Sequence, residues 1–217
     1  MRKSASRLFA WALGLTLIAA AGLANAQQLP LTKTWEIGDR LTYNMAIRGR
    51  SALLVEEVVA VNDREIRLAQ YMGERLYDGA LTVDGMARVR GMCHGAREAC
   101  TWSPAEVWAR FPLEAGKMWS ERLLVTSDEL VTDVVVERKV EEPEMVSTLA
   151  GRFEAFRITA TERYASRRKN GRRASEGMAF MTYWIAAISD KPVIVKWEYR
   201  TSTGERFERE LVSAALR

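Results

Sequence analysis

The chain has 217 residues and a formal net charge of +4. The first 26 residues contain three of the 32 basic residues and none of the 28 acidic ones, so the remainder, with 29 basic against 28 acidic residues, is almost neutral. Nucleic-acid-binding domains are usually strongly basic, so we expect no nucleic-acid partner. Residues 27–217 are enough for a single domain with its own core.

The N-terminus has the pattern of a secretory signal peptide. Arg2, Lys3 and Arg7 precede an apolar run at 8–22, and Ala24-Asn25-Ala26 is a small-x-small cleavage site. The run is short for a hydrocarbon core of roughly 30 Å, which favours cleavage after Ala26 over a retained transmembrane anchor. We therefore expect a periplasmic protein that does not span the membrane.

Beyond the signal, apolar and polar residues alternate with the period of β-strands that have one buried face. The two clearest examples are 40–48, where Leu41, Tyr43, Met45 and Ile47 share a face, and 193–200, where Val193, Val195, Trp197 and Tyr199 do. Less regular runs lie at 51–61, 64–72, 75–83, 118–126, 130–140, 153–165, 177–187 and 205–214. In the last of these runs Arg209 is in phase with Phe207 and Leu211, so it either faces inward or is turned outward by a bulge.

Turn-forming pairs separate these runs, at Asn62-Asp63, Asp84-Gly85, Asn170-Gly171 and Thr203-Gly204. About ten or eleven short strands joined by tight turns predict a mainly β, single-domain antiparallel meander. Because a twisted sheet of that many strands curls, we expect an open or partial barrel with an apolar concave face. Two sheets of one sandwich, divided by an insertion at 91–117, are the alternative.

The insertion contains both cysteines, Cys93 and Cys100. In an exported protein such a pair predicts a disulfide bond. The spacing does not fit a Cys-x-x-Cys redox pair, and two cysteines are too few for a zinc site. Closing so short a loop stabilises a fold by about 2 to 2.5 kcal/mol.

A short helix is predicted near 103–110. Ser103-Pro104-Ala105-Glu106 has the form of a capping box, and the residue before Pro112 is disfavoured in a helix. Trp108 lies on the apolar side of this helix, together with Val107 and Phe111. The helix would either fill the core or act as a lid over a ligand cavity.

No residue pattern predicts catalysis. His94 is the single histidine, the sequence contains no Gly-x-Ser-x-Gly nucleophile elbow, and the acid pairs at 56–57 and 141–142 would point to opposite faces of strands. Glycine-rich phosphate loops and metal-ligand clusters are also absent from the sequence. We therefore expect neither an enzyme nor a cofactor or metal.

A basic hairpin tip surrounds Asn170-Gly171 and consists of Arg167, Arg168, Lys169, Arg172 and Arg173. Such a tip either binds an anionic membrane surface or an acidic partner, or is a solvated turn. The acid-rich stretch at 141–144 either pairs with this tip or forms another exposed turn.

Four segments resemble a broad group of exported Gram-negative β-rich proteins of unknown function: 35–39, 111–119, 150–158, and Tyr183-Trp184 followed by 195–198. That group is more distantly similar to the half-barrels of lipoprotein carriers and receptors, which hold acyl chains on a concave apolar face. The resemblance implies architectural roles for these motifs and identifies no catalytic residue. Because no lipobox cysteine ends the signal, a lipid anchor is not expected.

From the curled sheet and its aromatic residues we expect a non-catalytic binding or carrier protein for an apolar, lipid-like ligand. The residues expected to contact the ligand are Trp108, Tyr183, Trp184, Val195, Trp197 and Tyr199. The alternative is a protein-interaction module in cell-envelope assembly, which would use a sheet edge or the basic hairpin tip.

Overall fold

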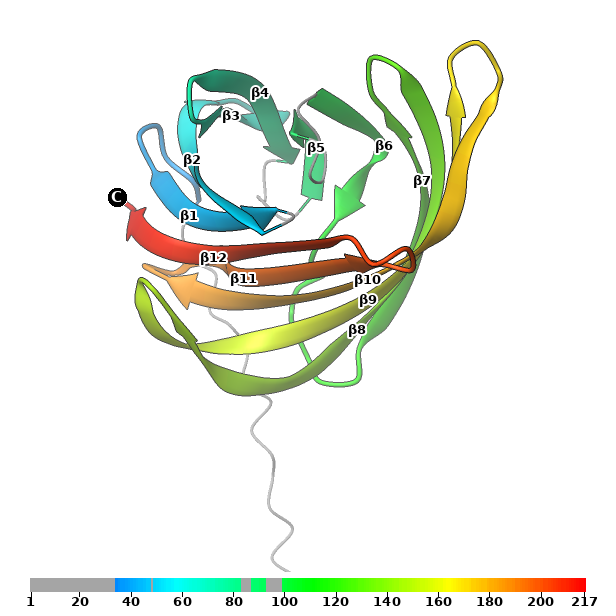
Figure 1. Ribbon diagram of the computed structural model, residues 1–217. Coiled ribbons are helices and arrows are strands. Elements are labelled where there is room, and N and C mark those ends of the chain that lie inside the picture. Colours follow the sequence, from blue (N-terminus) through cyan, green and yellow to red (C-terminus); the bar gives the residue numbers. More distant parts are fainter. Residues whose placement is uncertain (1–33, 48, 83–86, 93–98) are drawn as a thin grey trace, which may run out of the picture.

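The chain folds into an antiparallel β-barrel (Figure 1). The computed structural model describes residues 34–217 except 48, 83–86 and 93–98. The described strands are β1 (Arg40–Ile47), β2 (Arg50–Val61), β3 (Glu65–Met72), β4 (Arg75–Thr82), β5 (Ala87–Met92), β6 (Ala99–Val107), β7 (Met118–Thr126), β8 (Leu130–Thr148), β9 (Gly151–Arg168), β10 (Arg173–Ile188), β11 (Lys191–Thr201) and β12 (Arg206–Ala215).

The barrel is closed, so the expectation of an open or partial barrel was wrong. Each strand pairs with the next in sequence, and β1 also pairs with β12, with Tyr43 opposite Leu211 and Ile47 opposite Phe207. A bulge beside Tyr43 adjusts the register of this closing pair. Closure gives every described strand a partner on both sides, and so removes the free edges that an open sheet would leave.

The helix expected near 103–110 is also absent, and the described residues contain no helix at all. Instead β6 runs to Val107, pairing with β7 through Thr101 to Ser103 and with β5 through Glu106 and Val107. A two-turn helix is marginal by itself. The strand hydrogen bonds and the ion pairs of Glu106 outweigh the local preference for a helix. The Glu106 carboxylate binds Arg88 and Arg138, and not the backbone N–H of Ser103 as a capping box would require.

Strand β8 is much longer than the sequence pattern indicated. β8 continues through the acid-rich stretch at 141–144, where a bulge between Val140 and Pro143 accommodates the proline. This stretch is therefore strand and not a turn. The β8–β9 hairpin ends against β12, where the N–H of Ala150 donates to the carbonyl of Leu211 at 3.0 Å.

Several expected turns are confirmed. Asn62 joins β2 to β3, and its side-chain oxygen accepts hydrogen bonds from the N–H groups of Arg64 and Glu65. Gly171, at the tip between β9 and β10, has φ +83°, a conformation that favours glycine. The turn expected at Asp84-Gly85 lies outside the described residues.

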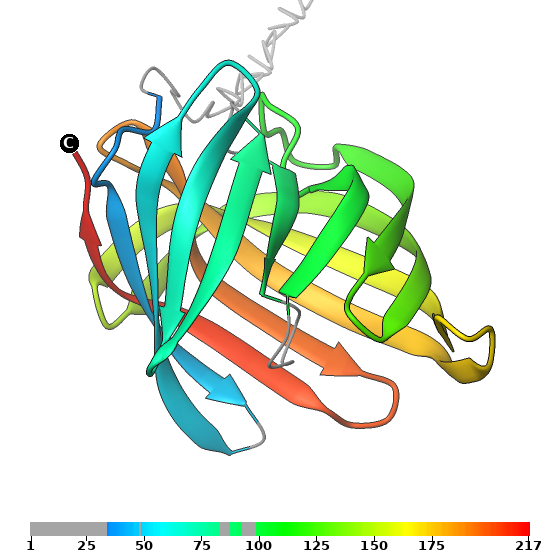
Figure 2. The same cartoon turned by 90° about the horizontal axis from the view of Figure 1, so that it is seen from above.

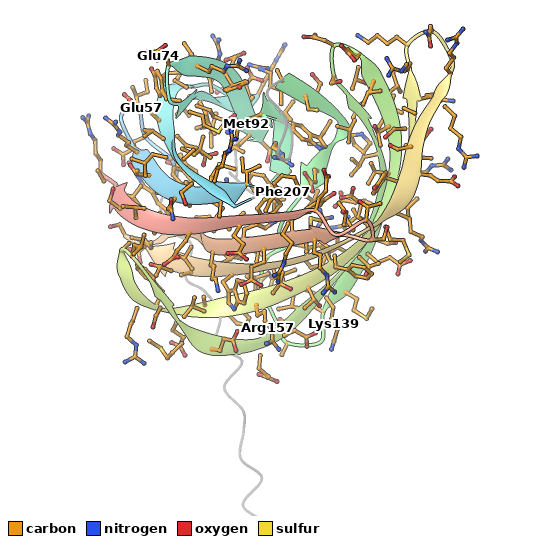
Figure 3. All side chains as sticks on the ribbon, viewed as in Figure 1. Glu57, Glu74, Met92, Lys139, Arg157 and Phe207 are labelled. Carbon is orange, nitrogen blue, oxygen red and sulfur yellow. The ribbon has the colours of Figure 1, made fainter. Side chains whose placement is uncertain are left out.

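Apolar side chains gather in two clusters inside and around the barrel. The first contains Trp102, Val134, Tyr199 and Phe207, and the second contains Tyr43, Leu54, Val193 and Val195. Figure 2 shows the barrel from above, with the first strands in front of the longer, later ones. In Figure 3, Met92 and Phe207 lie toward the inside, whereas Lys139 and Arg157 lie on the convex outer side of β8 and β9.

A buried ion pair fixes the start of β1 to β11. The ammonium of Lys191 donates to Asp39 Oδ2 at 2.6 Å, and both side chains are fully buried. Burial opposes ionisation of Asp39, but the hydrogen bonds from Lys191 and from the N–H groups of Glu36 and Arg217 hold its pKa below the ordinary value. In the part of the chain that the structure describes, no helix is long and apolar enough to cross a membrane.

Candidate functional site: a cavity above a buried charged layer

The described barrel contains a cavity of about 310 Å³, which we call the large cavity. It lies at the end of the barrel where the turns after β7, β9 and β11 are found (Figure 1). Ligand pockets range from roughly 300 to 1,000 Å³, so this cavity has the size of a small-molecule site. Two other cavities of the described barrel are much smaller, with volumes of about 60 and 40 Å³.

The lining of the large cavity is mixed, with apolar and aromatic side chains along its wall and polar side chains at its mouth. Wall residues include Trp102, Leu123, Val134, Tyr199 and Phe207. Side-chain hydroxyl groups surround the end nearest the turns, from Ser127, Thr132, Ser166, Ser175 and Thr201. The apolar part of the wall, between the mouth and the inner end, suits a ligand with an apolar chain.

Buried charged side chains form a layer at the inner end of the cavity, called the charged layer below; it contains Arg88, Glu106, Glu121 and Arg138. Glu106, which lines both this cavity and the 60 Å³ cavity, accepts hydrogen bonds from Arg88 at 2.6 Å and from Arg138 at 2.8 Å. Arg138 also pairs with Glu121, and the Arg138 side chain is fully buried. The guanidinium of Arg88 lies over the ring of Trp102, 3.8 Å from its centroid.

A second set of polar groups extends this layer toward β1 and β2. Glu56 accepts a hydrogen bond from Gln70 at 2.7 Å and lies 3.5 Å from a guanidinium nitrogen of Arg209. Arg209 faces inward, over the ring of Tyr43 at 4.4 Å from its centroid. The sequence left an inward and an outward orientation open for Arg209. The structure has the inward one, with Glu56 and the ring of Tyr43 as partners.

Glu162 differs from these carboxylates. It lies on the inward face of β9, between Ala160 and Tyr164, and lines the large cavity. Its side chain is 9 % exposed, and no hydrogen bond or ion pair joins it to another residue in the described part of the chain. Burial, and to a smaller extent the charge of Glu106, raise the pKa of Glu162 to about 7, although Arg138 and Arg88 oppose this rise.

The residues expected to bind a ligand fall into three groups. Tyr199 lines the large cavity. Trp108, Tyr183 and Trp197 line the 60 Å³ cavity on the other side of the charged layer, where the hydroxyl of Tyr183 donates to the carbonyl of Trp108 at 2.6 Å. The expected site is thus divided between two hollows that share Glu106.

Val195 and Trp184 line neither hollow. A bulge opposite Trp184 inserts Val195 into β11, so Ile194, and not Val195, continues the inward phase of Trp197. Val195 is completely buried in the second apolar cluster. The Trp184 indole donates to Glu144 at 2.6 Å, and Lys196 lies over its ring.

The basic hairpin tip is partly neutralised. Arg167 pairs with Asp133, and Arg173 pairs with Glu176. Asp128 and Glu129 belong to the neighbouring β7–β8 turn, where the carbonyl of Glu129 accepts a hydrogen bond from the N–H of Lys169. Arg168, Lys169 and Arg172 remain exposed beside these acids.

Several sequence predictions fall on residues outside the described ones. These are the signal peptide at 1–26 with its cleavage site, His94, and Cys93. Cys100 is buried in β6 beside the large cavity, and the Cys93–Cys100 disulfide stays a prediction. Among the described residues, no cluster of three or more histidine, cysteine or acidic side chains could hold a metal ion.

Comparisons with known proteins identify a fold and not a family. No protein-family model and no curated protein sequence matches the chain. A crystal structure of a "putative lipoprotein" from Parabacteroides distasonis is similar over 87 % of this chain and 98 % of its own, with 11 % identity and a TM-score of 0.50. This likeness indicates a shared fold alone, because fold does not determine function.

Two other solved structures are less similar. A "putative exported protein with YmcC-like fold" from Bacteroides fragilis has 12 % identity and a TM-score of 0.43, covering 83 % of this chain and 97 % of its own. The "hypothetical lipoprotein YmcC" from Escherichia coli has 9 % identity and a TM-score of 0.47, covering 85 % and 92 %. With scores this low, no argument rests on either.

Proposed function

We propose that this protein is a non-catalytic binding or carrier protein that holds the apolar part of a small molecule in the large cavity. The observation that carries the proposal is the 310 Å³ cavity, which is lined by residues of strands β6 to β12 and has apolar and aromatic side chains in its wall. A water-sized group takes roughly 30 Å³, so the cavity has room for about ten such groups. A medium-length alkyl chain with a small head group fits this volume.

The proposal includes an exported location. The signal-peptide pattern at 1–26 supports export, with cleavage after Ala26 and action in the periplasm. A carrier with such a cavity can move an apolar molecule through water, because the barrel removes apolar surface of the ligand from contact with water.

Calorimetric titration with 1-octanol tests the proposal. We expect saturable binding of one molecule per chain. Val134→Trp, which places an indole in the cavity wall, is expected to weaken binding at least tenfold, whereas Val59→Trp on the exposed outer face of β2 leaves it unchanged. Absence of saturable octanol binding, or equal binding by the Val134→Trp variant, would contradict the proposed function.

A further inference from the structure

We propose that the ligand of the large cavity carries a cationic amine, which binds the carboxylate of Glu162 while its apolar chain extends toward the mouth. This inference rests on the proposed function and adds the chemical class of the ligand. Three features support it: the position of Glu162, the pairing of the charged side chains near it, and the aromatic rings that line the same cavity.

Glu162 is deep in the cavity. On β9 it is four residues from Ser166 at the mouth, a distance of roughly 13 Å along a strand. Across the sheet it is opposite Val136, two residues before Arg138 of the charged layer. A group bound to Glu162 is therefore at the inner end of the cavity, and the chain attached to it passes Val134 and Phe207 on its way out.

The arginines of the charged layer already have carboxylate partners. Arg88 and Arg138 share Glu106, and Arg138 also has Glu121. Arg209 is paired with Glu56. When ionised, Glu162 adds a negative charge beside arginines that already have carboxylate partners.

A buried carboxylate without a partner is costly, and a ligand that supplies a positive charge removes much of that cost. An ammonium group does so and also donates hydrogen bonds. A fatty acid would bring a second negative charge close to Glu162 and Glu106. The same layer therefore favours an amine over a carboxylic acid of equal chain length.

The aromatic wall favours the same ligand. Tyr199 and Phe207 both line the cavity, with ring centroids 5.5 Å apart, and Trp102 lies on the facing strand β6. Aromatic ring faces attract organic cations. A cavity whose lining combines a carboxylate with aromatic rings is a suitable environment for an alkylammonium compound.

Binding should depend on pH because Glu162 must be ionised. Around it are Glu106 on β6, Arg88 on β5, Arg138 on β8, Tyr164 on β9, Tyr199 on β11, and Glu205 before β12. Glu106 opposes ionisation of Glu162, and the two arginines favour it. The pKa of Glu162 of about 7 means that most of the free protein is protonated there at pH 6 and ionised at pH 8.

The test is calorimetric titration with octylamine, sodium octanoate and 1-octanol at pH 6 and pH 8. Alkylamines, like lysine, are protonated at both pH values. For the unmodified protein we expect octylamine to bind about tenfold more tightly at pH 8 than at pH 6, and at pH 8 more tightly than octanol or octanoate.

Glu162→Gln keeps the shape of the side chain and removes its charge. We expect this variant to bind octylamine no more tightly than octanol and to lose the pH dependence of octylamine binding. Glu137→Gln, which removes an exposed carboxylate from the outer face of β8, should behave like the unmodified protein.

The outcomes separate the two proposals. Octanol binding without a preference for octylamine, or an unchanged preference in the Glu162→Gln variant, would overturn the amine assignment and leave the proposed function standing. Tighter binding of octanoate than of octylamine would overturn it as well. If octanol shows no saturable binding, the proposed function fails, and the amine assignment, which rests on it, fails with it.

Discussion

Replacing Glu162 by glutamine should change how the stability of the unliganded protein depends on pH. Burial raises the pKa of this carboxyl from 4.5 to about 7. Each pH unit between these values corresponds to about 1.4 kcal/mol. The ionised carboxylate therefore destabilises the fold by about 3 kcal/mol, an order-of-magnitude figure that applies because the side chain is almost fully buried.

The sign follows from proton binding. Below pH 4.5, Glu162 is protonated in both the folded and the unfolded chain and contributes no pH dependence. Between pH 4.5 and 7 the unfolded chain releases this proton while the folded chain retains it, so the contribution of Glu162 to stability falls as pH rises. Above pH 7 the full cost is present, and the glutamine variant does not incur it.

Urea unfolding at pH 4.5, 6 and 8 measures this effect. Glu162→Gln should match the unmodified protein at pH 4.5 and exceed its free energy of unfolding by up to about 3 kcal/mol at pH 8. Glu137→Gln, from an exposed ion pair, should differ by less than about 1 kcal/mol at every pH. A constant difference between the Glu162→Gln and unmodified proteins across this range would refute the reasoning.

Three further predictions concern packing and pairing. Val195→Trp should destabilise the protein by about 1 to 3 kcal/mol, because Val195 is fully buried and lines none of the three cavities. Val134→Trp should destabilise it less, because the new indole enters the 310 Å³ cavity. Equal shifts of the two variants in thermal melts would contradict this prediction. Asp39→Asn should lower the free energy of unfolding in urea by about 3 to 5 kcal/mol, because it removes the buried carboxylate that pairs with the Lys191 ammonium. A decrease of less than about 1 kcal/mol would show that this ion pair is unimportant for stability. Thiol titration of the denatured, unreduced protein should find no free thiol at Cys93 and Cys100, and two free thiols would exclude the predicted disulfide.

Strand positions could be predicted from sequence because alternation is a local property. The patterns at 40–48 and 193–200 correspond to β1 and β11, and the turns at Asn62 and Gly171 follow from local backbone chemistry. Closure could not be predicted in this way. It depends on pairing between β1 and β12, which are far apart in sequence, and an open sheet has the same alternation.

The error at 103–110 has a different physical origin. A capping box predicts a helix only when nothing stronger engages the same residues. Here Trp102 and Ser103 pair with β7, and Glu106 binds two arginines from neighbouring strands. These contacts come from distant parts of the chain, so no local pattern indicates them.

The candidate site was only partly visible in the sequence. Aromatic residues pointed to a hollow interior, and Tyr199 does line the large cavity. Glu162 was missed, although it falls in the inward phase of β9 between Ile158, Ala160 and Tyr164. A charged residue in such a phase is the signal that could have identified it, as it did for Arg209 in β12. The bulge at Val195 had no such signal.

The most direct test of the central claim, that the barrel carries a small molecule in its large cavity, is native mass spectrometry of the protein released from cells without detergent. The account predicts one bound small molecule per chain for the unmodified protein and its loss from the Val134→Trp variant. Detection of the bare polypeptide alone, or of the same bound mass in the Val134→Trp variant, would contradict the account.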